Sequence, residues 1–431
     1  MLTQEENKLL TEVTNKSPME RLMRSHWVPV CLSEELPEND GTPLLVEVFG
    51  CRYVAFRDTN GKVGLVDELC PHRHASLLFG RNENCGITCL YHGWKFDVKG
   101  NCTGMPSEPA GSDLINKVKH NAYQTNECGA FVWAWLGDQE QILAFQRPAF
   151  APTDDTQVSV TKIRIPANWA QIMEGQIDSS HSSSLHSSDM VPARVDGAAA
   201  DDKAWYRPST DRSPRLLVER TDYGFHYAAL RNPMKQAAIN DYFRVTEYIA
   251  PFTCLIPPNS SYNVTTIVVP IDDHNSILNF IASGSDSCPS TDEWRKFNHS
   301  VVGVDLDENW ISKRQLHNKF LQDRDLMKAG NFTGVPGIPN QDIIMWVSMG
   351  PIVDRTTDRL AASDLAVVEF RKLMVDAAKS MHQNGEALGS RSKLQQTEIC
   401  SYEGVHPKNT DWKALCRTTG ASSDELIKKP A

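Results

Sequence analysis

The sequence lacks the features of membrane-spanning, secreted and disulfide-rich proteins. No apolar run approaches the roughly 20 residues that a helix needs to cross a lipid bilayer. The chain starts with MLTQEENKLL, which is too polar and acidic for a secretory signal. Eleven cysteines among 431 residues are too sparse, and odd in number, for a disulfide scaffold. These absences predict a cytoplasmic protein whose thiols are mostly reduced.

The chain also lacks an excess of positive charge. It carries 44 lysines and arginines against 54 aspartates and glutamates, which gives a formal net charge of −10. Nucleic acids and anionic membranes are therefore not expected as partners. An anionic small molecule is still compatible with this balance, because a local pocket can be cationic. The length and an apolar content of 40% suit two or three globular domains.

Two cysteine–histidine pairs form the most informative pattern in the sequence. Cys70 and His72 stand in C-P-H-R-H-A, Cys89 and His92 stand in C-L-Y-H-G-W, and sixteen residues separate His72 from Cys89. Two thiolates on one iron and two imidazoles on the other can hold a [2Fe–2S] cluster, whose reduction potential the neutral imidazoles raise. A structural zinc site uses the same residue types, but it usually groups two cysteines and then two histidines. One cysteine and one histidine on each loop favour the cluster.

This pattern resembles the Rieske proteins, and among them the ring-hydroxylating oxygenases. Respiratory Rieske proteins carry an extra cysteine on each loop, joined as a disulfide, whereas the matching positions here are Ala75 and Tyr91. His74 stands where many relatives have a small residue, but the C-x-H spacing favours His72 as the ligand. We interpret His74 as a surface or interface residue.

A second set of candidate metal ligands lies further along the chain. One segment offers Asp178, His181 and His186, and Asp342 in N-Q-D-I-I-M-W is the best source of a distal carboxylate. Two imidazoles and one carboxylate on one face of a metal leave positions open for oxygen, as in mononuclear non-haem iron(II) oxygenases. The arrangement D-x2-H-x4-H with a distal aspartate again resembles the Rieske oxygenases.

We expect residues 168–188 to be helical. Asp178 and His181 are three residues apart and would share a helix face, so the carboxylate could accept a hydrogen bond from the imidazole. His181 and His186 are five residues apart, and a regular α-helix would not place them on one face. A π-type distortion, eased by the weak helix formers Ser182–Ser184, would align them.

The first third of the chain predicts a β domain behind a short N-terminal segment. Residues 1–43 contain a short helix over 3–13 and a strand over 26–32, and we expect them to pack with the catalytic domain. Residues 44–150 contain short strands with partial alternation, and Asn60-Gly61 is a strong hairpin signal between two of them. This range is the expected Rieske domain.

The pattern of the remaining sequence predicts an α+β catalytic domain over residues 156–431. It contains several candidate strands, a charged helical stretch over 291–328 and a long amphipathic helix over 363–385. A curved antiparallel sheet around this long helix is the helix-grip arrangement. Such a fold leaves a cavity between helix and sheet that can hold an apolar ligand.

The resemblance implies a path for electrons and an oligomer. In Rieske oxygenases the cluster of one subunit approaches the iron of its neighbour, and an aspartate bridges a cluster histidine and an iron histidine. Here these residues would be Asp178, His92 and His181. The implied assembly is a head-to-tail homotrimer, or a homohexamer of two stacked trimers.

The substrate expectation comes from a closer resemblance. The strings E-G-Q-I-D-S-S-H-S-S-S-L-H-S-S and M-G-P-I-V-D-R most resemble the phthalate dioxygenase group, α-only oxygenases that act on aromatic carboxylates, although Val347 replaces a frequent glutamate. A dicarboxylate needs fixed cations, and arginine offers planar, bidentate donors. Arg207 and Arg244 are the candidate substrate-binding residues, and Ser179 could add a hydroxyl donor. Three further cationic residues remain possible partners of the substrate carboxylates, namely Lys203, Arg220 and Arg231.

The resemblance thus implies the oxygenase component of a phthalate 4,5-dioxygenase-type system. An NADH-dependent reductase with FMN and a plant-type ferredoxin centre would reduce the cluster, and both atoms of O2 would add to adjacent ring carbons. Alternatives are a Rieske monooxygenase or O-demethylase, or a dioxygenase for another aromatic acid such as a chloro- or phenoxybenzoate. Two other classes of protein are also considered. A pure electron carrier would explain the cluster but would leave the candidate iron ligands unused. A zinc-stabilised ligand-binding protein would be colourless, whereas a protein with the cluster is red-brown.

Overall fold

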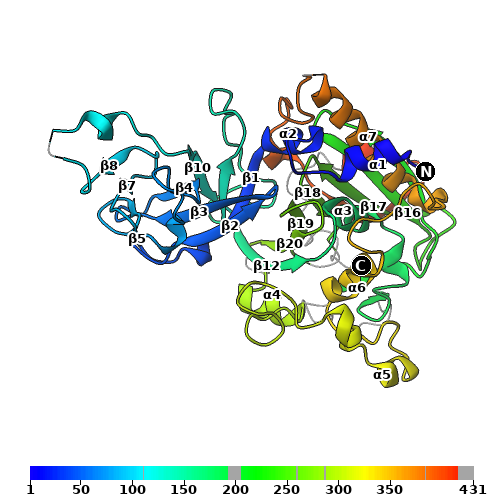
Figure 1. Cartoon of the computed structure of the whole chain (residues 1–431). Helices are drawn as coiled ribbons and strands as arrows, with labels where there is room; N and C mark the ends of the chain where they lie inside the picture. Colours follow the sequence, from blue (N-terminus) through cyan, green and yellow to red (C-terminus); the bar gives the residue numbers. More distant parts are fainter. Residues whose placement is uncertain (110, 193–204, 259–260, 286–287, 384, 416–431) are drawn as a thin grey trace. The chain divides into compact units, whose positions relative to one another are not determined.

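The structure is a computed structural model that describes all residues except 110, 193–204, 259–260, 286–287, 384 and 416–431 (Figure 1). The chain forms two compact units: residues 14–16 with 23–145, and residues 1–13 and 17–22 with 146–431. This division differs from the expected one at residues 14–16 and 23–43, which belong to the smaller unit, and at residues 146–150, which belong to the larger unit. Residues 23–43 join the smaller unit because strand β1 (Trp27–Leu32) pairs with β11 (Phe131–Trp135).

The smaller unit contains three antiparallel sheets (Figure 1). The first has the order β1-β11-β10, with β10 at Thr125–Cys128. The second joins β2 (Leu44–Val48), β3 (Cys51–Arg57), β4 (Val63–Asp67) and β9 (Ala122–Tyr123). The third joins β5 (Arg81–Asn82), β6 (Ile87–Thr88), β7 (Lys95–Phe96) and β8 (Cys102–Gly104).

The prediction that this unit consists of short β-strands is confirmed, including the hairpin between β3 and β4. Gly61 has a φ of 77°, which the turn requires and glycine adopts at little cost. Apolar side chains of the second and third sheets, such as Val54 and Phe96, share one core with Cys70 and Cys89. The two cysteines are therefore held in an apolar environment by packing from both sheets.

The larger unit is organised by one eight-stranded sheet. Its strand order is β12-β20-β19-β18-β17-β16-β15, and β21 also pairs with β17. The strands are β12 (Gln157–Ile165), β15 (Arg215–Arg220), β16 (Gly224–Arg231), β17 (Asn240–Ile249), β18 (Thr253–Ile256), β19 (Asn263–Pro270), β20 (Ser276–Gly284) and β21 (Tyr402–Pro407). Its ladders are antiparallel, as expected. A separate parallel pair consists of β13 (Met190–Pro192) and β14 (Trp205–Arg207).

The predicted long helix is α7 (Leu365–His382), and it packs on β15 and β16. Its buried residues recur at helical spacing, as Ala366, Phe370, Met374 and Ala377 illustrate. The α+β fold with a sheet and a long helix is therefore confirmed. The other helices are α1 (Gln4–Thr11), α2 (Pro18–Arg24), α3 (Trp169–Ile177), α4 (Thr291–Phe297), α5 (Arg324–Lys328), α6 (Ile338–Ser348) and α8 (Trp412–Leu415). Among the described residues, none of the helices combines the length and apolarity that a membrane span requires.

The prediction of a helical stretch over residues 291–328 is wrong for most of its length. Only α4 and α5 are α-helical there, and the chain between them consists of turns, bends and loop residues with one 3₁₀ segment over Leu316–Leu321. Asp307 illustrates the cause, because its carboxylate accepts hydrogen bonds from the backbone N–H groups of Asn309 and Ile311. Such local bonds compete with helix formation.

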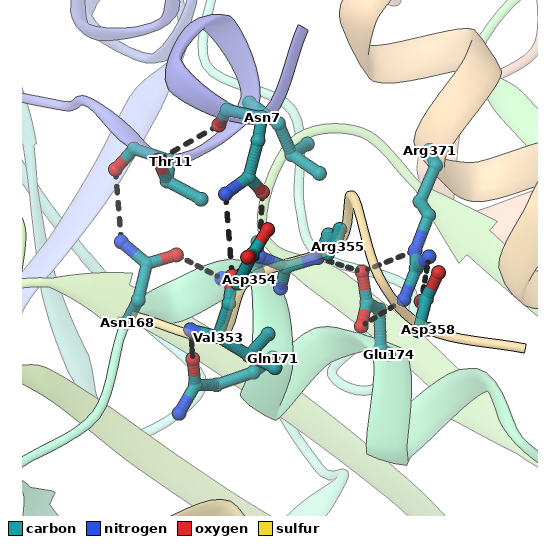
Figure 2. A network of polar contacts seen from close by, with 12 residues as sticks. Asn7, Thr11, Asn168, Gln171, Glu174, Val353, Asp354, Arg355, Asp358 and Arg371 are labelled. Carbon is teal, nitrogen blue, oxygen red and sulfur yellow. Dashed lines mark hydrogen bonds and ion pairs between the residues drawn. The ribbon is translucent and has the colours of Figure 1, made fainter. Parts of the chain in front are cut away.

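Helix α3 leads into the candidate iron residues, and a buried polar network fixes it (Figure 2). Glu174 accepts hydrogen bonds from Arg355 at 2.7 Å and from Arg371 at 2.9 Å. Burial raises the pKa of Glu174, but these two arginines outweigh burial and hold that pKa below its usual value. At the start of the helix, Asn168 donates to the backbone oxygen of Thr11 and caps the first turn. Both ends of α3 are thus anchored before the chain reaches Asp178.

Candidate functional site

The segment that carries the candidate ligands leaves the α-helix earlier than predicted. Helix α3 ends at Ile177, Asp178 is its C-cap, and a 3₁₀ turn covers His181–Ser183. The expected helix over 168–188 with a π-type distortion is therefore wrong. The carboxylate of Asp178 accepts a hydrogen bond from the backbone N–H of Ser180 at 2.6 Å. This local bond replaces the bond that a continuing helix would make.

The structure brings His181, His186 and Asp342 together, and their ligand atoms all lie within 4.8 Å of one another. The Nε2 atoms of the two histidines are 3.1 Å apart. Oδ1 of Asp342, which α6 presents, lies 3.5 Å from Nε2 of His181 and 3.3 Å from Nε2 of His186. Three ligand atoms therefore converge on one point from two different segments of the chain.

The surroundings of these residues fit a divalent iron ion. Nδ1 of His186 lies 2.8 Å from Oε1 of Gln341, so Nδ1 carries the proton and Nε2 is left as a ligand. Nδ1 of His181 is buried without a hydrogen-bond partner among the described residues, and Oδ2 of Asp178 lies 3.5 Å from it. Burial raises the pKa of Asp178, but His181 and the Ser180 N–H lower it below its usual value. Two imidazoles and one carboxylate form the donor set of non-haem iron(II) sites.

A pocket opens onto these three residues. Its wall includes apolar side chains such as Tyr227, Phe280 and Ile338, together with Ser179 and Arg244. Of the predicted substrate residues, the structure thus places Ser179 and Arg244 in the pocket. An aromatic ring could lie against the apolar wall while a charged group meets the guanidinium of Arg244.

Arg207 supports the ligand segment and is not among the residues that line the pocket. Its guanidinium donates to the hydroxyls of Ser182 at 2.6 Å and Ser183 at 2.9 Å. Among the cations left open, Arg231 donates to the backbone oxygen of Ser179 at 2.8 Å, whereas Arg220 pairs with Glu369 and Asp376. Lys203 lies outside the described residues.

The three buried arginines form a cationic cluster with one carboxylate. Burial, with the charges of Arg244 and Arg231, lowers the pKa of Arg207 to about 9. Burial and Arg244 lower the pKa of Arg231 to about 10. Glu403 on β21 lies 3.2 Å from Nη1 of Arg244, yet burial raises its pKa to about 7. Burial is the main cause of these lowered pKa values and repulsion between the cations is the second, and a bound anion would stabilise the charged arginines against both.

Three residues of this site were missed by the sequence analysis: Gln341, Asp189 and Glu403. Gln341 precedes Asp342 on α6, Asp189 lies three residues after His186 and accepts a hydrogen bond from Gln341, and Glu403 lies on the distant strand β21. A lone glutamine or acid carries no spacing signal, so only the fold reveals these partners. The helical context of Asp342 was missed as well.

The four candidate cluster ligands lie on two loops of the smaller unit. Cys70 and Cys89 are buried, whereas His72 and His92 are partly exposed, with ring centroids 4.4 Å apart. Burial raises the pKa of the Cys70 thiol to about 11, and the neighbouring Cys89 adds to this. Two buried thiols and two neighbouring, partly exposed imidazoles fit a cluster with one iron bound by sulfur and one by nitrogen.

The two loops repeat the same backbone pattern. The N–H of Cys70 bonds to the oxygen of Ala75, and that of Cys89 to the oxygen of Trp94. The fourth residue after each cysteine has a positive φ, 59° at His74 and 73° at Gly93. His74 thus occupies the position that glycine takes in the second loop, and its side chain is exposed, as predicted.

Known protein families match both halves of the chain. The Rieske [2Fe-2S] domain family matches residues 26–122, and the family described as LigXa C-terminal domain like matches residues 134–428. The chain is 56% identical to the phthalate 4,5-dioxygenase oxygenase subunit of Pseudomonas putida, over 96% of this chain and 94% of that protein. It is 32% identical to the 3-chlorobenzoate-3,4-dioxygenase oxygenase subunit of Comamonas testosteroni, over 96% and 97%.

Solved structures support the same fold at low sequence identity. Dicamba monooxygenase bound to dicamba superposes with a TM-score of 0.57 at 17% identity, covering 84% of this chain and 98% of that chain. NdmB of Pseudomonas putida CBB5 gives a TM-score of 0.58 at 20% identity, covering 87% and 97%.

Proposed function

This chain belongs to the Rieske oxygenases as an oxygenase subunit, and we propose that it dihydroxylates phthalate at carbons 4 and 5. The observation that carries this proposal is the placement of Arg244 in the same pocket as His181, His186 and Asp342. A fixed cation beside an iron-type site suits an aromatic substrate with carboxylate groups. The 56% identity to a phthalate 4,5-dioxygenase oxygenase subunit supports the same substrate.

The metal centres would be held by residues that the motifs and the geometry both favour. Cys70, His72, Cys89 and His92 would bind the [2Fe–2S] cluster, and His181, His186 and Asp342 would bind iron(II). When bound, the cluster supplies electrons one at a time and the iron supplies oxygen activation.

The rest of the pocket would bind and orient the substrate. Arg244 would pair with a carboxylate of phthalate, and Ser179 would donate a hydroxyl hydrogen bond to it. Arg207 and Arg231 would contribute positive charge from behind the pocket while they hold the serine-rich segment. The side chains of Tyr227 and Phe280 would pack on the ring and exclude water from the reacting carbons.

Glu403 predicts a pH dependence of substrate binding. Above its pKa of about 7 the carboxylate is ionised and offsets the charge of Arg244, whereas below that pH it is neutral. Phthalate affinity should therefore rise by about 3- to 10-fold as the pH falls from about 8 to 6. The variant Glu403→Gln should bind phthalate tightly at both pH values, as calorimetric titration would measure. An equal pH response in the two proteins would rule out this role for Glu403.

Electrons would reach the cluster from a reductase that oxidises NADH and carries FMN and a plant-type ferredoxin centre. The cluster of one subunit would then reduce the iron of a neighbour in a head-to-tail trimer or a stacked hexamer. Exposed apolar residues beside the cluster ligands support a protein contact there, because Leu69, Leu90 and Tyr91 are 48%, 62% and 56% exposed. Asp178 would connect His92 of one subunit to His181 of the next.

The substrate proposal can be tested without the reductase. The chemically reduced protein is mixed with oxygen in the presence of phthalate, 3-chlorobenzoate, 3-phenoxybenzoate or benzoate, and oxidation of the cluster is followed by absorbance. Phthalate should accelerate oxidation most strongly. Acceleration by a monocarboxylate alone would replace phthalate with another aromatic acid, and iron analysis near two rather than three per chain would overturn the oxygenase proposal.

A further inference from the structure

Gln341 links His186, a candidate iron ligand, to the carboxylate of Asp189, which is not a candidate ligand. Its Oε1 lies 2.8 Å from Nδ1 of His186. Its Nε2 donates to Oδ2 of Asp189 at 2.6 Å and to the backbone oxygen of Val335 at 2.9 Å. Gln341 is 1% exposed, and its bonds to His186 and Val335 are buried. The bond to Asp189 is partly buried, because Asp189 itself is exposed.

The partners of Gln341 permit one orientation of its amide. The Asp189 carboxylate and the Val335 carbonyl are acceptors, so the NH2 group must face them. The amide oxygen then faces His186, and it can only accept a hydrogen bond. His186 must therefore hold a proton on Nδ1, so in the neutral imidazole the unprotonated atom is Nε2, which lies 3.3 Å from Asp342.

The chain builds this link from two short segments. Gln341 and Asp342 are adjacent on α6, so one helical turn presents a ligand and the partner of a second ligand. Asp189 lies on the turn that follows His186, and its backbone N–H bonds to the His186 oxygen at 3.0 Å. A displacement of α6 would therefore move Asp342 and release the ring of His186 together.

We propose that Gln341, oriented by Asp189, is a positioning residue that fixes the tautomer and ring orientation of His186 for metal binding. This inference rests on the proposed iron site. Histidine ligands in metalloproteins usually donate their second ring N–H to a carboxylate, carbonyl or water, and loss of that partner lowers metal affinity. Here a buried amide serves as the partner, and the carboxylate lies one hydrogen bond further out.

Metal affinity gives a direct test. The protein is depleted of its mononuclear metal by dialysis against a chelator, with the cluster retained, and Co²⁺ is titrated in competition with a coloured chelator. The variant Gln341→Leu should weaken Co²⁺ binding by about 10- to 100-fold. Its visible cobalt spectrum should also change, because a reoriented imidazole alters the ligand field.

A matched control separates positioning from loss of packing. Gln171 is also buried and also bonds to the end of α6, donating to the backbone oxygen of Trp346 at 2.9 Å, but its hydrogen bonds do not involve His186. Gln171→Leu should therefore leave Co²⁺ affinity within about threefold of the wild type if the protein folds. Equal losses in the two variants would overturn the proposal.

A second pair of variants keeps the test decisive if Gln341→Leu does not fold. Gln341→Glu retains an acceptor for His186 but places two carboxylates opposite each other, so it should weaken Co²⁺ binding. Adding Asp189→Asn restores a donor at that contact and should recover most of the lost affinity. No recovery in the double variant would contradict the role of Asp189. Failure of the wild-type protein to bind Co²⁺ would instead overturn the proposed iron site.

Discussion

Replacing Asp178 with asparagine should leave both metal centres loaded and slow electron transfer between them by about 100-fold. Asp178 is not among the three residues that converge as iron ligands, and asparagine keeps an amide oxygen that can accept from Nδ1 of His181, so iron content should be preserved. Its carboxylate lies 3.5 Å from Nδ1 of His181, where it can accept a hydrogen bond from that ring N–H. An asparagine cannot supply the charge that stabilises this contact, and the proposed bridge to His92 of a neighbouring subunit would be weakened as well.

The measurement is rapid mixing of the reduced protein with oxygen and phthalate, with cluster oxidation followed by absorbance. Asp241→Asn is a suitable control, because Asp241 is a buried aspartate of the same unit that pairs with Arg215 on the sheet. That control should oxidise its cluster at nearly the wild-type rate. Normal oxidation of the cluster in Asp178→Asn would exclude Asp178 from the electron path.

Replacing Arg244 with alanine should weaken phthalate binding by about 10- to 100-fold, because a hydrogen bond to a charged group contributes about 1.5–3 kcal/mol. Glu403 pairs with Arg244 at 3.2 Å, and loss of this guanidinium raises the pKa of the buried carboxyl further. We therefore expect Glu403 to be neutral in the variant and to contribute little to the loss. Calorimetric titration of phthalate gives the affinity directly.

A neutral ligand and a conservative variant test whether charge is responsible. The diamide of phthalate has a similar shape but no charge, and its affinity should change by less than about threefold in Arg244→Ala. Arg244→Lys keeps the charge but loses the planar fork, so phthalate binding should fall by an intermediate amount. Equal losses for phthalate and the diamide would remove Arg244 from the role of anion-binding residue.

Local patterns predicted the smaller unit well. Short strands and the Asn60-Gly61 turn follow from neighbouring residues, and the hairpin is found where it was expected. The long helix α7 was also predicted, because its apolar residues repeat over 18 residues and leave few alternatives. In both cases the signal is contained in a continuous stretch of sequence.

The errors arose where side chains compete with the backbone for hydrogen bonds. After Ile177 the segment is rich in serine, and the bond from the Ser180 N–H to the Asp178 carboxylate replaces a helical bond where the helix was expected to continue. Arg207 donates to the hydroxyls of Ser182 and Ser183, a contact that its sequence position did not indicate, and its role in substrate binding stays a prediction. The role of Gln341 could not be predicted, since its partners come from segments that only the fold brings together.

The most direct test of the proposed function is a single turnover with isotopically labelled oxygen. The protein is reduced chemically, mixed with phthalate and ¹⁸O2, and the products are analysed by mass spectrometry. The account predicts a cis-4,5-dihydrodiol of phthalate that carries two labelled atoms. A product with one labelled atom, or an unchanged phthalate while another aromatic acid is dihydroxylated, would contradict it.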